Sequence, residues 1–261
     1  EVNPTKYAEW LAWSEPKVKK IDAGLEGVAF MVMAMAEKTP AAKDAMEVIL
    51  TGQEADGSWK PAGQLGGMQK RSNDEARENA TRLHLLALDA LDPKGVATVA
   101  AREKAAKWVG RDVLPESVEA LIFRALYARR FGEAEKATAL RTEILQLQHE
   151  DGGWAWSIKE VKSDPLATGQ VLHLLSLYED KYSAADMAVK RAQAWLIGTQ
   201  REDGAWSIDP MRISKTDRSG EKKSRSLKNV TEIYEFWGTV WATIGLLQGV
   251  PVVEAVQAKA P

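Results

Sequence analysis

The segment Gln148-His149-Glu150-Asp151-Gly152-Gly153-Trp154 decides the expected fold, because its pattern occurs three times in the chain. The pattern reads Gln-x-x-Asp-Gly-x-Trp, and three copies in the same register indicate an internal repeat. The repeated residues are Gln53, Asp56, Gly57 and Trp59 in the first copy, Gln148, Asp151, Gly152 and Trp154 in the second, and Gln200, Asp203, Gly204 and Trp206 in the third.

The spacing of the copies predicts a further, degenerate copy. The first two copies begin 95 residues apart and the last two 52 residues apart. Half of the longer distance is about 47 residues, a usual length for a repeated helical pair. A degenerate copy is therefore expected near residues 100–115, where the chain reads Lys107-Trp108-Val109-Gly110-Arg111-Asp112-Val113.

The motif is made of residue types that end helices and connect them. Asp-Gly favours a tight turn, in which the glycine takes the left-handed conformation and the aspartate accepts hydrogen bonds from nearby amides. Glutamine at a helix end can satisfy free backbone groups, and tryptophan buries a large ring while it keeps an N–H donor. A structural role for the motif is therefore favoured over a catalytic one.

The spacing of apolar residues predicts an all-α fold. Apolar residues recur three and four positions apart along almost the whole chain, and no stretch alternates as a β-strand does. Segments such as 171–177 are apolar on most sides, whereas segments such as 184–197 have one charged face. Inner and outer helices should therefore alternate as stacked hairpins. The expected helices are 3–13, 18–37, 41–53, 74–91, 97–109, 116–130, 133–148, 165–177, 184–200 and 230–248.

Composition excludes several classes of protein. With 35 basic against 37 acidic residues the net charge is −2, which argues against nucleic acid as a partner. No apolar run is long enough to span a bilayer. The chain has no cysteine, which removes disulfides, thiolate zinc sites, iron–sulfur clusters and a cysteine nucleophile. Together with the missing initiator methionine, this favours an exported or periplasmic protein, although the compartment stays open.

On its repeated motifs the sequence resembles the squalene/hopene-cyclase and protein-prenyltransferase repeat superfamily, whose glutamine–tryptophan motifs have the same form. The resemblance covers about residues 40–250. It implies an α/α toroid of about five helical hairpins, with inner helices around a central apolar cavity and outer helices around them. The whole chain, 1–261, is expected to form one such domain.

The chemistry that the resemblance implies is incomplete in this chain. Prenyltransferases of the superfamily hold zinc with aspartate, cysteine and histidine, and this chain has no cysteine. Cyclases carry a D-x-D-D-T motif, but at the equivalent helix start, 164–168, Leu166 stands where the proton-donating aspartate is expected. We therefore expect no metal and no other cofactor, and whether the protein is an enzyme stays uncertain.

Two carboxylates, Asp164 and Glu235, are the candidate catalytic acids, and each precedes a threonine by four residues. On a helix this spacing places the acid and the threonine on one face, one turn apart. The alternative is helix capping, because carboxylates at helix N-termini stabilise the free amides there. The residues expected to contact a ligand are Thr168, Glu232, Tyr234, Trp237, Thr239 and Trp241.

Two further patterns have both a functional and a structural interpretation. Trp237 and Trp241 lie one turn apart, and they would either hold an isoprenoid chain or a carbocation, or pack in the core. Acidic residues at the starts of other inner helices would either form a rim around the cavity or complement the helix dipoles. These acidic residues are Asp74, Glu75, Glu78, Glu116 and Glu119.

Residues 211–228 carry the strongest charge asymmetry of the chain, with seven basic and two acidic side chains. The segment has no apolar periodicity, and a solvated loop is expected there. The alternative is a contact with a diphosphate, an anionic membrane surface or an acidic partner.

The sequence thus predicts a repeat domain that binds an apolar, isoprenoid-like ligand or a protein partner, without the usual cyclase or prenyltransferase chemistry. One alternative is an isoprenoid cyclase that uses Asp164 or Glu235 as its acid. A more distant alternative is a glycan-active toroid, which would need paired carboxylates across an open cleft.

Overall fold

The computed structural model describes residues 25–34, 40–67, 71–111, 113–178, 184–208 and 221–247, and within them the fold is all-α, as predicted. Pairing of extended backbone is limited, in these ranges, to isolated bridges. None of the described helices is long and apolar enough to cross a membrane. The helices are α2 (Leu25–Ala34), α3 (Pro40–Thr51), α4 (Gly63–Gly67), α5 (Asn73–Leu91), α6 (Val96–Val109), α7 (Val118–Arg130), α8 (Ala134–Gln146), α9 (Pro165–Ser176), α10 (Ala184–Thr199) and α11 (Glu221–Leu247).

The helix boundaries differ most from prediction at the last helix. Helix α11 begins at Glu221 instead of residue 230, so the loop expected over 221–228 is wrong. Its first turns contain mostly good helix formers and no proline or glycine, and a helix extends readily once its buried half has formed. The short helix α4 was not predicted. The helix expected at 3–13 and the basic residues before 221 lie outside the described residues.

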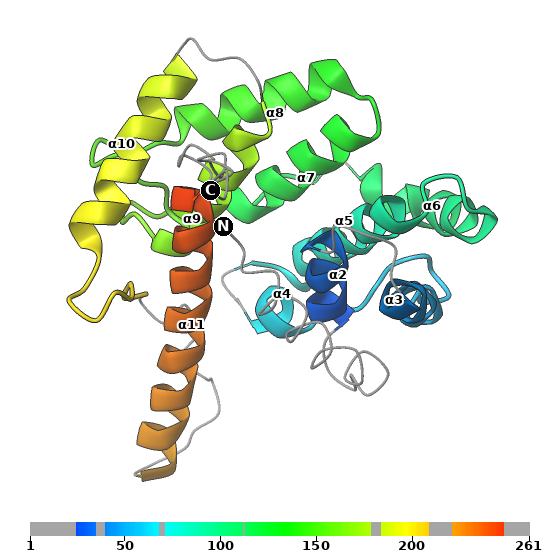
Figure 1. The fold of residues 1–261 in the computed structure, drawn as a ribbon, viewed down its shortest axis with the longest axis horizontal. Coiled ribbons are helices and arrows are strands. Elements are labelled where there is room, and N and C mark those ends of the chain that lie inside the picture. Colours follow the sequence, from blue (N-terminus) through cyan, green and yellow to red (C-terminus); the bar gives the residue numbers. More distant parts are fainter. Residues whose placement is uncertain are drawn as a thin grey trace, which may run out of the picture.

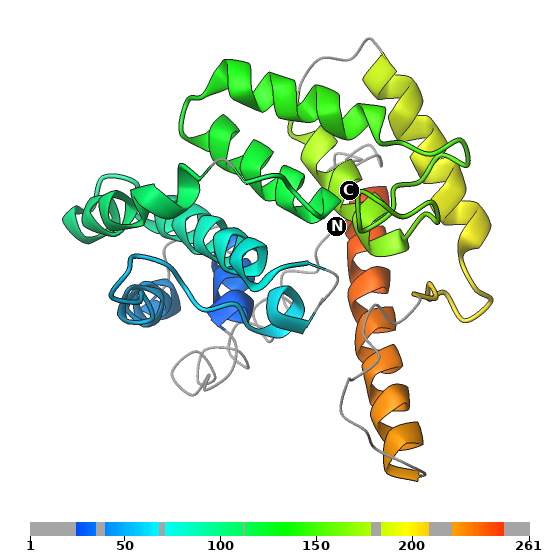
Figure 2. The same ribbon diagram turned by 180° about the vertical axis from the view of Figure 1, so that it is seen from behind.

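The helices lie in two layers. Helix α9 is buried on nearly all sides, whereas α8 buries only Ala137 and Ile144. Figures 1 and 2 show α10, α8, α6 and α3 following one another around the outside, with α9, α7, α5 and α2 inside them. This is the predicted alternation of inner and outer helices. Closure of the two layers into a toroid stays a prediction.

Neighbouring inner helices run in the same direction. This is shown by side-chain contacts that join their corresponding ends. Each pair of helices has one contact near its N-terminal ends and one near its C-terminal ends. As a result, the N-terminal ends of α5, α7 and α9 gather on one side of the protein. The contacts are Glu75–Ser117 and Asp89–Arg130 between α5 and α7, and Glu119–Gln170 and Arg129–Leu177 between α7 and the end of α9.

The three repeat copies form the same turn, after α3, α8 and α10. The glycine has a positive φ in each, at 86° for Gly57, 97° for Gly152 and 82° for Gly204. The aspartate Oδ1 accepts the backbone N–H two residues later, at 3.0, 2.9 and 3.1 Å in the three copies. The glutamine Nε2 donates to the glycine carbonyl at 3.0, 2.8 and 2.8 Å. These contacts are those of the predicted turn.

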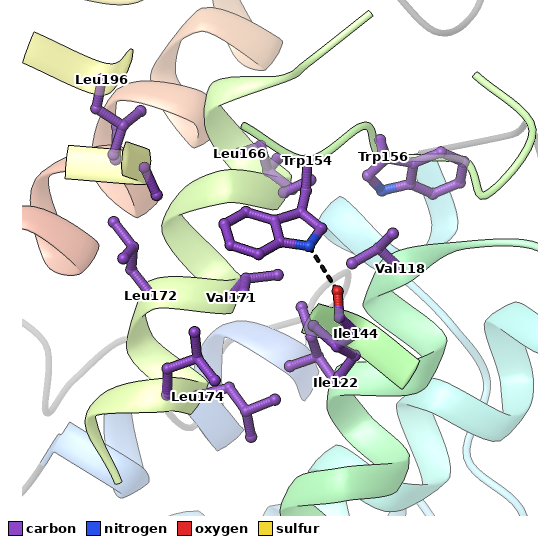
Figure 3. Packing of buried hydrophobic residues seen from close by; sticks show 14 of the residues in the cluster. Val118, Ile122, Ile144, Trp154, Trp156, Leu166, Val171, Leu172, Leu174 and Leu196 are labelled. Atoms are coloured by element: carbon purple, nitrogen blue, oxygen red, sulfur yellow. Dashed lines mark hydrogen bonds between the residues drawn. The ribbon is translucent and has the colours of Figure 1, made fainter. Parts of the chain in front are cut away.

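Each motif tryptophan connects its turn to the end of the preceding outer helix. The indole N–H of Trp154 donates to the carbonyl of Ile144 at 2.7 Å, and Figure 3 shows this ring among apolar side chains such as Leu166 and Val171. The carbonyl belongs to the last turn of α8 and also accepts the backbone N–H of Leu147 at 3.1 Å. The indole N–H is its second donor, so the ring is buried without an unpaired N–H. The equivalent bonds are Trp59 to Ile49 at 2.7 Å and Trp206 to Leu196 at 2.8 Å.

A threonine of the next inner helix completes each repeat. Its hydroxyl oxygen accepts the backbone N–H of the motif tryptophan, although the intervening chain differs in length among the copies. The threonine therefore fixes the register of the inner helix against the turn. The pairs are Trp59 with Thr81 at 3.2 Å, Trp154 with Thr168 at 3.0 Å, and Trp206 with Thr239 at 3.2 Å.

Two of the three turns also hold the following outer helix. Gln53 Nε2 donates to the carbonyl of Ala101 in α6 at 2.8 Å. In the second copy, Gln148 Nε2 donates to the carbonyl of Ala188 in α10, also at 2.8 Å. One glutamine amide therefore joins its own turn to a helix of the next hairpin.

Two glycine substitutions should separate turn strain from helix docking. Gly152→Ala and Gly204→Ala both place a side chain at positive φ, which costs about 1–2 kcal/mol. A Cβ at Gly152 would also lie 2.7 Å from the carbonyl oxygen of Arg191 in α10, whereas at Gly204 the nearest atom of the described residues would be 3.9 Å away. We expect Gly152→Ala to lower the free energy of unfolding by about 2 kcal/mol more than Gly204→Ala. Equal losses in urea denaturation would contradict this account of the docking.

Candidate functional site

Asp164 is the N-cap residue of α9. Its Oδ1 accepts the backbone N–H groups of Leu166 and Ala167, at 2.8 and 3.0 Å. These bonds satisfy two of the amides that a helix start leaves free. The capping interpretation of Asp164 is therefore supported, and its role as a catalytic acid stays a prediction.

Glu235 lies on α11, where it is partly exposed. Its Oε1 accepts a hydrogen bond from Arg201 Nη1 at 2.8 Å, and Arg201 also pairs with Asp203 of the third turn. Glu232, one turn earlier, is exposed. The geometry thus connects Glu235 to the third repeat turn, and a catalytic role for it also stays a prediction.

The two threonines expected to contact a ligand have structural partners. Thr168 is fully buried, and Thr239 is partly buried. Each accepts the backbone N–H of a motif tryptophan, as described above. Their contact with a ligand has no support from this geometry and stays a prediction.

The aromatic residues expected to hold a ligand pack in or against the apolar core. Tyr234 is buried, and its ring centre lies 5.5 Å from that of Trp237, within the apolar core. The ring centre of Trp241 lies 5.9 Å from that of Phe30 in α2 and 6.1 Å from that of His173 in α9. Trp237 and Trp241 both pack against this core, so core packing is supported for all three, and Trp241 also connects α11 with α2 and α9.

A set of buried polar side chains gathers at the first two turns of the inner helices. Arg71, just before α5, pairs with Glu119 of α7, and Gln170 Nε2 of α9 donates to the same carboxylate at 3.0 Å. The Arg71 guanidinium also lies over the ring of Trp156, 5.2 Å from its centre. Every member of the set is at most 8% exposed. We call these residues the central polar cluster: Glu26, Arg71, Glu75, Asn79, Glu119, Trp156 and Gln170.

Backbone amides and a hydroxyl stabilise the other two carboxylates of the cluster. Glu26 of α2 accepts the N–H groups of Ala62 at 2.6 Å and of Leu65 at 3.0 Å, which joins α2 to α4. Glu75 accepts the hydroxyl of Ser117, the N-cap of α7, at 2.6 Å. The central polar cluster thus contains three carboxylates and one guanidinium, so its charge is unbalanced.

Burial raises the pKa of two carboxyl groups of the cluster. Burial raises the pKa of Glu26 from 4.5 to about 7, although the amides of Leu65 and Ala62 and the charge of Arg71 oppose the rise. Burial also raises the pKa of Glu75, against the hydroxyl of Ser117. Desolvation disfavours a charged carboxylate, and Arg71 compensates only in part. Glu26 is therefore partly protonated near neutral pH.

Several atoms of the cluster are buried without a hydrogen-bond partner among the described residues. They are both amide atoms of Asn79, Oε1 of Gln170, Nε of Arg71 and Nε1 of Trp156. An unmet donor or acceptor costs about 1–3 kcal/mol, so such groups usually face water or a polar ligand. The interior that the resemblance predicts to be apolar is polar at this point.

The sequence located this cluster only in part. Glu75 and Glu119 belong to the predicted acidic rim, but they are buried between helices. Asp74, in contrast, is at the surface and pairs with Arg111 at 2.6 Å. The signal that would have found Glu26 is a single charged side chain in an otherwise apolar helix. Gln170 is likewise a polar residue in a largely apolar helix. Asn79 lies among other polar residues of α5, so no pattern in the sequence marks it.

The described residues contain no group of three or more histidine, aspartate or glutamate side chains that could hold a metal ion. His84 is fully buried, with its Nδ1 2.6 Å from the carbonyl of Ala80 and its ring stacked on Trp59 at 5.5 Å. Burial lowers the pKa of His84 to about 4, which keeps it neutral. His149 contacts the hydroxyl of Ser163 at 3.0 Å. Both histidines are therefore part of the packing.

No model of a known protein family matches the chain, and no curated protein matches it. The resemblance to cyclase and prenyltransferase repeats therefore rests on the motif residues, and membership of that superfamily stays a prediction.

The raised pKa of Glu26 predicts a loss of stability with rising pH. Between pH 4.5 and about 7 the folded state keeps a proton that the unfolded state releases. The stabilisation is complete below this window and is lost as the pH rises through the folded pKa. We expect the free energy of unfolding to fall by roughly 2–3 kcal/mol more in the wild type than in Glu26→Gln over this window.

Urea denaturation at a series of pH values would measure this difference. Glu103→Gln, at an exposed position of α6, should keep the wild-type dependence. Parallel curves for the wild type and Glu26→Gln would show that Glu26 does not retain its proton.

Proposed function

We propose that this chain is a non-catalytic binding domain of helical hairpins, whose end at α10 and α11 receives helices of a protein partner. The observation that carries the proposal is the third repeat turn. It has the internal hydrogen bonds of the other two turns, yet no outer helix among the described residues lies against it.

The amide of Gln200 illustrates the difference between the turns. Gln53 and Gln148 each donate to their own turn and to an outer helix of the next hairpin. Gln200 Nε2 donates to the carbonyl of Gly204 within its own turn, and both residues are exposed. In the other turns the outer helix has an alanine, Ala101 or Ala188, at this contact. A partner helix with a small residue at the same place could accept a hydrogen bond from Gln200 and pack on Gly204.

The register of the threonines identifies a second part of this surface. Thr168 and Thr239 occupy equivalent positions, so Gly169 of α9 corresponds to Val240 of α11. Gly169 is where α11 packs on α9, since a Cβ there would lie 2.2 Å from the carbonyl oxygen of Trp241. The side of α11 that carries Val240 is therefore where a further inner helix would pack.

That side of α11 carries an exposed apolar row. Ile233 is 47% exposed, Phe236 65%, Val240 37% and Leu247 61%. Their spacings of three, four and seven residues place them along one side of the helix. Exposed rows of this kind mark interaction surfaces more often than scattered apolar residues do. The row and the third turn together fit a pair of helices.

The alternatives have less support in the geometry. An isoprenoid needs an apolar interior, whereas the central polar cluster lies between the inner helices. An acid for cyclisation needs a free carboxylate, whereas Asp164 caps α9 and Glu235 pairs with Arg201. A glycan-active toroid needs carboxylates in an open cleft, and the carboxylates of the cluster are buried.

A helical hairpin of this chain can serve as the probe. A labelled peptide with the sequence of residues 165–199 contains α9 and α10, which pack on the second turn and its neighbours. We expect it to bind the wild-type protein with a Kd on the order of 100 μM in fluorescence polarisation. Phe236→Glu and Gln200→Ala should each weaken binding at least about tenfold, because they change the apolar row and the turn.

Val161→Glu is the matched control, because Val161 is 92% exposed but lies outside this surface. Equal binding by the wild type and Phe236→Glu, or no binding at all, would overturn the proposal. A stable wild-type dimer in sedimentation equilibrium that Phe236→Glu dissociates would also overturn it, because a second copy would then occupy the surface.

A further inference from the structure

A pocket of about 430 Å³ opens beside the connection from α6 to α7, near the degenerate repeat copy. Its lining includes Val109 at the end of α6, Arg82 of α5, Leu121 and Arg124 of α7, and Leu140 of α8. The volume is in the range of pockets that hold small molecules. Neither the repeat motif nor the surface proposed above uses it.

The register of the outer helices shows why the pocket lies here. Ala101 of α6 and Ala188 of α10 are equivalent, since each accepts a hydrogen bond from a motif glutamine. Eight residues after Ala188, the carbonyl of Leu196 accepts the indole N–H of Trp206. Eight residues after Ala101 lies Val109. The degenerate copy supplies no motif tryptophan to this carbonyl.

An arginine takes the place of the indole donor. Arg82 Nη2 donates to the carbonyl of Val109 at 2.9 Å. Trp108, the tryptophan of the degenerate copy, lies elsewhere, with the guanidinium groups of Arg77 and Arg111 over its ring at 5.8 and 4.7 Å. The helix end is therefore satisfied without an aromatic ring, and space is left beside it.

The wall of the pocket carries excess positive charge. Arg82 and Arg124 share one carboxylate, Glu78, and Arg124 Nε and Nη2 lie 3.0 and 2.9 Å from its Oε1. Arg124 Nη2 also donates to the carbonyl of Val113 at 2.7 Å. These bonds fix both guanidinium groups, and one carboxylate does not neutralise two of them.

The other charges of the described lining are two paired cations and one carboxylate, Glu143. Arg111 pairs with Asp74 at 2.6 Å, and Lys136 pairs with Glu133 at 2.8 Å, both near the surface. Glu143 also lines the pocket and would repel an anion on its side. The fixed arginines therefore define the end at which an anion is favoured.

The rest of the lining is apolar. Val109, Val113, Leu121 and Leu140 line the pocket, and Leu114 is 89% exposed beside it. A ligand that fits both parts has an apolar or aromatic body and a carboxylate, because the two fixed guanidinium groups attract an anion and Nη1 of Arg124 takes part in none of the bonds above. We propose that this pocket binds a small aromatic carboxylate, whose ring occupies the place of the missing motif tryptophan.

Isothermal titration calorimetry with three probes tests the proposal. Indole-3-acetate carries the ring and the carboxylate, tryptamine carries the ring and a positive charge, and inorganic phosphate carries only the anion. We expect indole-3-acetate to bind with a Kd on the order of 10–100 μM, and the other two to bind at least about tenfold more weakly. Equal binding of tryptamine or of phosphate would overturn the proposal, as would no binding of indole-3-acetate.

Variants of the lining locate the bound probe. Arg124→Gln should weaken the binding of indole-3-acetate at least about tenfold, while Arg129→Gln, on the same helix but outside the lining, should not. Leu140→Trp should fill the pocket and abolish binding, while Ile197→Trp, an exposed position of α10, should not. Leu114→Trp tests the same prediction at the exposed mouth if Leu140→Trp fails to fold. Undiminished binding by Arg124→Gln and by a folded tryptophan variant would place the probe elsewhere.

Discussion

Each repeat turn has to bury an indole ring and still provide a partner for its N–H group. The carbonyl that accepts this N–H lies near the end of the preceding outer helix. Once the ring is fixed, the backbone N–H of the same tryptophan holds a threonine of the next inner helix. In two of the three turns the glutamine also reaches the next outer helix. The layered arrangement depends on this chain of contacts.

The polar interior follows from where the inner helices begin. Because they run in the same direction, their N-terminal turns meet, and carboxylates there accept backbone amides and the hydroxyl of Ser117. Three carboxylates in one buried place cannot all be charged at low cost, so Arg71 pairs with Glu119 and Glu26 keeps its proton near neutral pH. An interior of this kind suits polar contacts better than an isoprenoid chain.

The sequence was sufficient where structure is decided locally. The motif turns, the all-α class and most helix ends depend on residues within a few positions of one another, and these predictions are confirmed. The start of α11 was mispredicted because 221–229 lacks apolar periodicity, although its residues favour a helix. Thr81, Glu26 and Gln170 were missed because their partners lie 22 to 51 residues away, and one polar side chain does not indicate which helix it will meet.

The repeat turn also affects how the array can change in evolution. Each turn forms its hydrogen bonds with the outer helix before it and the inner helix after it. A duplicated hairpin would therefore contain its own donors, acceptors and glycine. The degenerate copy shows that one such joint can lose its tryptophan when an arginine satisfies the helix end instead. Duplication can therefore lengthen the protein, and drift within one joint can free a space for a new ligand, without disturbing the remaining hairpins.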